Sequence, residues 1–120
     1  NKNVTVKFLG AKSRKFISEY MRRSHCLLHP SKFESYGHVI LESFSNGLPV
    51  LISNKTPWFN LKKRRLGANI NLSDMNQFIK ELIKIKKLKK KSFLRLRQNI
   101  LQYYNNIVKK NNRYLDKKIF

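Results

Sequence analysis

Cysteine and acidic residues are scarce in this chain of 120 residues, and each scarcity is informative. The single cysteine, Cys26, cannot form an internal disulfide, so a hydrophobic core must hold the fold together. No apolar run reaches the roughly 18 residues expected of a membrane-spanning helix. The first residues also lack a signal-peptide pattern. Asp and Glu number 6 against 27 Lys and Arg, which gives a formal net charge of +21.

The basic residues are concentrated in the second half of the chain, with nine up to residue 61 and eighteen beyond it. Such a charge attracts nucleic acid or an anionic membrane surface. Lysines that decorate solvated faces in a Lys-, Asn- and Ile-rich composition explain the same charge without any partner. A basic nucleic-acid- or membrane-binding module without catalysis therefore remains an alternative function.

Short apolar runs alternate with helical periodicity along the chain, which predicts an α/β fold. The β-branched or apolar segments 4–9, 26–29 and 50–53 predict strands, and Gly67–Ile70 predicts a short edge strand. The short connections between the first three strands imply a parallel sheet with right-handed crossovers.

Helices are expected between and after these strands. Ser13 is a suitable N-cap for the first helix, and Gly47 can end the second in a left-handed conformation. We expect Ser73 to cap a third helix and a final helix to begin near Ser92, with loosely held chain from about Asn111. The apolar positions predicted to be buried on the last two helices are Met75, Phe78, Ile79, Leu82 and Ile83, and Phe93, Leu96, Ile100, Tyr103, Tyr104 and Ile107.

The run from Glu34 to Glu42 carries two of the six acidic residues. If a helix begins after Gly37, Glu34 lies in the preceding loop and Glu42 in the second helical turn. Helical side chains lean toward the N-terminus, so both carboxylates can approach one volume above the helix start. Free backbone N–H groups and the helix dipole favour an anion there. The run also follows a strand of the predicted parallel sheet, where ligands bind, so the site suits a phosphorylated sugar or a nucleotide sugar.

A longer series of residues surrounds this pair. It comprises Phe8-Leu9-Gly10, Tyr20, Cys26-Leu-Leu-His-Pro-Ser31, Glu34-Ser-Tyr-Gly37, Glu42, Gly47-Leu-Pro-Val50 and Ser53. In order and spacing the series resembles the C-terminal domain of the family 4 (group 1) retaining glycosyltransferases, over roughly residues 4–85. The resemblance implies a Rossmann-like parallel sheet with flanking helices at 1–85, which is part of the nucleotide-sugar-binding domain of a GT-B enzyme. A basic C-terminal helix and tail follow at 86–120.

The resemblance also implies roles for individual residues. The implied donor-binding residues are Glu34, Ser35, Tyr36, Gly37, His38, Val39 and Glu42. Glu34, the implied catalytic residue, contacts donor-sugar hydroxyls, Glu42 binds the ribose hydroxyls, and the amides at the helix start face the diphosphate. The implied reaction transfers a sugar from a nucleotide-diphosphate donor to a hydroxyl of a saccharide or lipid-linked acceptor, with retention. No metal or other cofactor is expected.

The same resemblance implies a cytoplasmic enzyme of surface polysaccharide or glycolipid synthesis, with the inner face of the membrane as a candidate partner. A complete relative carries an N-terminal GT-B domain and upstream basic residues that this sequence lacks, so we expect a fragment or a truncated product. Other interpretations stay open for single residues. Glu34 and Glu42 could be surface carboxylates or join His29 and His38 in a metal site, and Trp58 could be a packing anchor.

Overall fold

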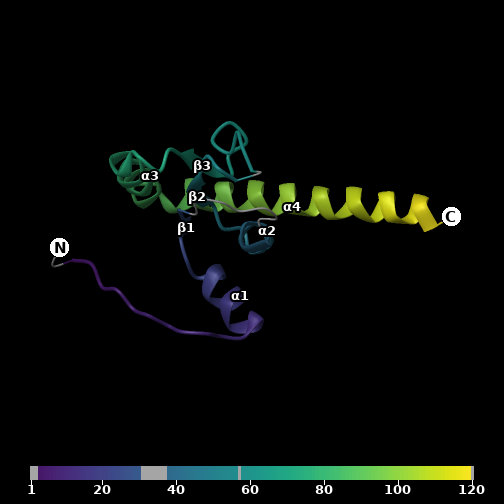
Figure 1. Ribbon diagram of the computed structural model, residues 1–120, viewed down its shortest axis with the longest axis horizontal. Coiled ribbons are helices and arrows are strands. Elements are labelled where there is room, and N and C mark those ends of the chain that lie inside the picture. Colours follow the sequence, from purple (N-terminus) through teal and green to yellow (C-terminus); the bar gives the residue numbers. More distant parts are fainter. Residues whose placement is uncertain (1–2, 31–37, 57, 120) are drawn as a thin grey trace.

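A three-stranded parallel sheet lies at the centre of the molecule, with helices on both of its faces (Figure 1). The computed structural model describes residues 3–30, 38–56 and 58–119, and from residue 112 on it describes the backbone alone. The elements are α1 (Arg14–Arg22), β1 (Leu27–His29), α2 (His38–Ser45), β2 (Val50–Ser53), β3 (Gly67–Ile70), α3 (Met75–Lys86) and α4 (Lys90–Ile119). This α/β architecture is the predicted Rossmann-like one, and the three strands at 26–29, 50–53 and 67–70 are confirmed within one residue.

Strand β2 is the centre of the sheet and of the core, because it pairs with β1 on one side and β3 on the other. All four of its residues are buried, as the apolar run Val50-Leu-Ile52 predicts for a strand covered on both faces. The pairing brings the backbones of Gly67 and Val50 so close that a Cβ on Gly67 would lie 1.8 Å from the Val50 carbonyl oxygen. Position 67, with a φ of 138°, therefore requires glycine.

Two clusters of buried side chains sandwich the sheet. On one face, α2 and α4 contribute Ile40, Phe44 and Ile100 to the larger cluster. On the other face, Phe78 of α3 packs against Leu51, which belongs to β2. The predicted buried side of α4 is confirmed, since Ile100 is fully buried and its other members are partly buried. The larger cluster also holds Trp58 edge-on to Phe44 at 5.4 Å, which makes Trp58 a packing anchor.

The predicted strand at residues 4–9 is wrong. This segment is extended but unpaired, and the side chains of Val4, Val6 and Phe8 are 64%, 71% and 96% exposed. In Figure 1 it runs outward from α1, away from the sheet. β-branched residues favour an extended backbone, but a strand also needs a neighbour, and within the described part of the chain β1 pairs with β2 alone.

The predicted buried face of α3 is also wrong. Of its five members the structure buries Phe78, while four are 62%, 51%, 45% and 42% exposed, namely Met75, Ile79, Leu82 and Ile83. Glu81 faces inward instead, where Lys62 and Lys84 neutralise its carboxylate at 2.9 and 3.3 Å. The cap differs as well, because the side chain of Asp74, not Ser73, accepts a hydrogen bond from the Gln77 amide.

Helix α4 starts at Lys90, two residues before the predicted start, and continues to Ile119. Its second half extends beyond the sheet in Figure 1. Among the described residues, no helix has the length and apolar character needed to cross a membrane.

Candidate functional site

The site is built around Glu42, and the ends of α2 determine where its carboxylate lies. The helix begins at His38, so Glu42 occupies the second turn as predicted. At the other end, the amides of Gly47 and Leu48 donate to the carbonyls of Phe44 and Ser43 at 3.0 Å each, which is a Schellman motif. Gly47 has a φ of 68°, so the predicted left-handed helix end is confirmed.

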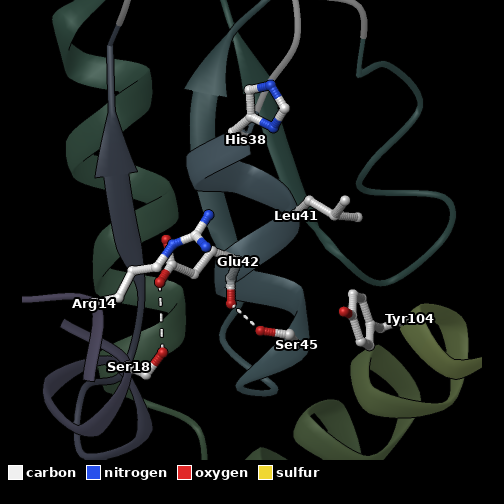
Figure 2. A pocket seen from close by; sticks show the side chains of 7 residues that line it. All are labelled: Arg14, Ser18, His38, Leu41, Glu42, Ser45 and Tyr104. Carbon is white, nitrogen blue, oxygen red and sulfur yellow. Dashed lines mark hydrogen bonds between the residues drawn. The ribbon is translucent and has the colours of Figure 1, made fainter. Parts of the chain in front are cut away.

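The Glu42 carboxylate lines an open cavity of about 270 Å³ between three helices (Figure 2). Arg14 and Ser18 come from α1, four residues come from α2, and Tyr104 comes from α4. Ser18 Oγ donates a hydrogen bond to Glu42 Oε1 over 3.4 Å. This contact ties the Glu42 carboxylate of α2 to α1.

Asn46 fixes the turn that carries Glu42. Its side-chain Nδ2 donates to the Glu42 carbonyl at 2.9 Å and to the Met21 sulfur at 3.7 Å, which ties α2 to α1. Ser45 Oγ donates to the same Glu42 carbonyl at 2.6 Å. The Arg97 guanidinium donates to the Asn46 carbonyl at 3.0 Å and thereby ties α2 to α4. The carboxylate is thus held on a backbone that is anchored from both sides.

The chemistry of the cavity favours a polar ligand that carries hydroxyl groups and a negative charge. Glu42 accepts hydrogen bonds from hydroxyls, and the hydroxyls of Ser18 and Ser45 both donate and accept. Arg14, an exposed side chain, supplies the positive charge and a fork of donors suited to phosphate. His38 is the first residue of α2. His38 and Glu42, both predicted donor-binding residues, line the same cavity.

The remaining predicted residues have different outcomes. Glu34, Ser35, Tyr36 and Gly37 lie outside the described residues, so the convergence of the two carboxylates stays a prediction. Val39 is placed in the first turn of α2, where its side chain packs against the larger core cluster and its implied role falls to the backbone amide.

Five cavity residues were not predicted as site residues, namely Arg14, Ser18, Leu41, Ser45 and Tyr104. Arg14 and Ser18 lie four positions apart, which places them on one face of α1. That spacing is a usable signal, because it marks a polar stripe on a helix whose apolar residues lie elsewhere. Tyr104 was predicted as a buried position of α4, and no sequence pattern indicates that it also borders a cavity on α2.

Cys26 takes no part in this site. It packs partly buried against the smaller core cluster, and desolvation by burial raises the pKa of its thiol to about 11. The thiol is therefore protonated at neutral pH, as expected for a small apolar residue in the core. Within residues 3–30, 38–56 and 58–111, no three His, Cys, Asp or Glu side chains gather closely enough to hold a metal ion.

The family described as Glycosyl transferases group 1 matches residues 1–61, which is more than half of the chain. The chain belongs to the group 1 glycosyltransferases. No curated protein matches it. The match includes all the cavity residues except Tyr104, and the parallel sheet with flanking helices is consistent with the C-terminal half-domain of a GT-B glycosyltransferase.

Proposed function

We propose that the chain is the nucleotide-sugar-binding part of a family 4 glycosyltransferase, which transfers a sugar to an acceptor hydroxyl with retention. In this proposal residues 1–85 hold the donor and residues 86–120 form a basic C-terminal extension. The acceptor is a saccharide or a lipid-linked saccharide of surface polysaccharide or glycolipid synthesis. Donor binding requires no metal or organic cofactor, because amides and basic side chains compensate the diphosphate charge.

The position of Glu42 carries the proposal. Its carboxylate lines a polar cavity beside Arg14, and Ser18 orients one of its two oxygens. A carboxylate is the preferred acceptor for a vicinal diol such as that of ribose, since two hydroxyls can donate to its oxygens. Glu42 therefore binds the ribose, and the amide groups at the start of α2 face the diphosphate. Glu34, eight residues earlier in the sequence, contacts the donor sugar.

The first experiment measures donor binding to the wild-type chain and to Glu42→Gln. Titration calorimetry with UDP-glucose, UDP-galactose and GDP-mannose identifies a donor, and Glu42→Gln should weaken it roughly ten- to hundredfold, because a charged acceptor is lost. Glu19→Gln is the matched control, since it removes the same charge from an exposed position of α1. Circular dichroism checks that both variants keep the fold. Equal donor affinity in wild type and Glu42→Gln would refute the assignment.

The nucleic-acid-binding alternative makes the opposite prediction. Binding of a DNA or RNA duplex through the surplus of basic residues should ignore Glu42→Gln and fall steeply as salt concentration rises. Retention of the anomeric configuration is tested with a longer protein in which this chain is joined to an acceptor-binding domain. The anomeric proton of the product should report the same configuration as the donor, and an inverted product would contradict the proposed family 4 mechanism.

A further inference from the structure

Helix α3 presents an apolar stripe to solvent. The stripe consists of Met75, Ile79, Leu82 and Ile83, which are 62%, 51%, 45% and 42% exposed. Their positions i, i+4, i+7 and i+8 place them on one face of the helix. On the neighbouring face Phe78 packs into the smaller core cluster, and Glu81 lies buried beside it. The apolar surface of the helix is thus wider than the part that the fold buries, and the stripe stays in contact with solvent.

Lysines lie along one edge of the stripe, at Lys80 and Lys87, and at its C-terminal end, at Lys86. Lys80, Lys84, Lys86 and Lys87 are all exposed, and Lys89–Lys91 continue the series into α4. The one acidic residue within α3, Glu81, points inward and is neutralised by Lys62 and Lys84. Desolvation raises the pKa of the Glu81 carboxyl, but hydrogen bonds from these lysines prevail and hold that pKa below its ordinary value. The carboxylate is therefore ionised and paired with lysines, and it adds no negative charge to the stripe. The outer face therefore combines apolar side chains with positive charge.

This combination determines which partner fits. A second copy of the chain would bring its own lysines against these, in a molecule of net charge +21, and the repulsion opposes a dimer through α3. A nucleic acid would satisfy the lysines but leave four apolar side chains in water. An anionic lipid surface satisfies both, since headgroups pair with the lysines while the apolar residues enter the acyl boundary.

We propose that α3 is a membrane-docking helix that lies in the plane of an anionic lipid surface, with the stripe Met75, Ile79, Leu82 and Ile83 inserted and Lys80, Lys86 and Lys87 on the headgroups. Phe78 anchors the helix to the sheet and Glu81 anchors it to Lys62 in the segment before β3, so the whole domain docks with it. The inference rests on the surface of α3 and not on the proposed donor site.

Vesicle sedimentation of the full chain tests the charge contribution. Vesicles with about a third phosphatidylglycerol should bind the chain, and pure phosphatidylcholine vesicles should not. Lys80→Gln with Lys86→Gln should weaken binding roughly 25-fold, because each lysine near an anionic surface contributes about a factor of five. Lys109→Gln with Lys110→Gln makes the same charge change at the far part of α4 and should weaken binding less than about threefold.

The apolar contribution needs its own pair of variants. Ile79→Asn with Leu82→Asn should weaken binding to the anionic vesicles at least about tenfold, because apolar area is no longer buried. Val4→Asn with Val6→Asn removes two exposed apolar side chains outside the stripe and should leave binding unchanged. All four positions are exposed, so the variants should fold, and circular dichroism verifies it.

The two methionines give a direct measurement on the unmodified chain. Met75 lies in the stripe and is 62% exposed, whereas Met21 is 7% exposed in the core, so methyl NMR has an internal control. Anionic bicelles with a nitroxide on the lipid acyl chain should broaden the Met75 methyl signal and spare Met21. Equal broadening of both signals, undiminished binding by Ile79→Asn with Leu82→Asn, or a dimer through α3 in sedimentation analysis would each overturn the proposal.

Discussion

The Arg97 guanidinium donates a hydrogen bond of 3.0 Å to the backbone carbonyl of Asn46, 51 residues earlier in the chain. This contact joins α4, which lies beyond the family match at 1–61, to the turn that ends α2. Because Asn46 in turn donates to the Glu42 carbonyl at 2.9 Å, the C-terminal helix supports the carboxylate of the candidate site. The basic helix is therefore structural for the site and not a detachable tail.

Replacing Arg97 tests this support. Arg97→Ala leaves the Asn46 carbonyl without its donor at the end of α2, so we expect the free energy of unfolding to fall by about 1 to 2 kcal/mol. Urea denaturation followed by circular dichroism measures the change. Arg95→Ala is the matched control, since Arg95 is an exposed arginine of the same helix. A similar loss of stability in both variants would mean that the contact contributes nothing specific.

Gly47 is expected to tolerate no side chain. Its φ of 68° is unfavourable for other residues, and a Cβ would lie 3.1 Å from Leu101 Cγ and 3.3 Å from the Arg97 carbonyl oxygen. Gly47→Ala should therefore lower the free energy of unfolding by roughly 1 to 3 kcal/mol, measured by urea denaturation. Gly10 is a useful control, because its φ is 70° but nothing lies within 4 Å of a built Cβ. Unchanged stability of Gly47→Ala would show that α4 does not pack against this turn.

Sequence patterns predicted a helix or strand correctly where the local conformation and the tertiary packing both favour the same secondary structure. The run Val50–Ser53 is apolar on both faces, so it fits only the centre of a covered sheet, and Gly47 fits only a helix end. Residues 4–9 carry an equally clear strand signal. A strand also needs a partner, and no local pattern in this segment specifies one, so the prediction failed.

The error on α3 has a different cause. Two faces of this helix compete for burial, and the apolar count favours the one with Met75 and Ile79. The fold turns the face with Phe78 and Glu81 inward, where Lys62, 19 residues before Glu81, reaches its carboxylate at 2.9 Å. Such a long-range ion pair leaves no trace in the periodicity of the helix. The cavity around Glu42 illustrates the same limit, since Arg14 and Tyr104 reach it from helices distant in sequence.

Cys26 should react slowly with thiol reagents in the folded protein. Burial raises its thiol pKa to about 11, so little thiolate exists near pH 8, whereas an unfolded cysteine has a pKa of about 8.5. The rate of alkylation by iodoacetamide should rise with pH up to about 11 in the native chain. In urea the same curve should level off about two pH units lower. Identical curves with and without urea would contradict the burial of this side chain.

Glu81 should make stability depend on pH. Desolvation opposes its ionisation, but hydrogen bonds from Lys62 and Lys84 prevail and lower the pKa of its carboxyl in the folded state. A group with a depressed pKa stabilises the fold fully above its unfolded pKa of about 4.3, and this contribution disappears as the pH falls through the lower folded value. Both lysines are mostly exposed, so screening limits the contribution to about 1 kcal/mol.

Glu81→Gln removes the charge while keeping the shape of the side chain. At pH 7 the variant should unfold at lower urea than wild type by this amount, and the difference should shrink toward zero as the pH falls below about 4. The raised pKa of Lys62 acts in the alkaline range, so it leaves the difference flat between pH 5 and 9. Glu19→Gln, an exposed position on α1, should show no difference at any pH. If Glu81→Gln lowered the free energy of unfolding by the same amount at every pH, packing of this side chain, and not its pairing with lysines, would account for its stabilising effect.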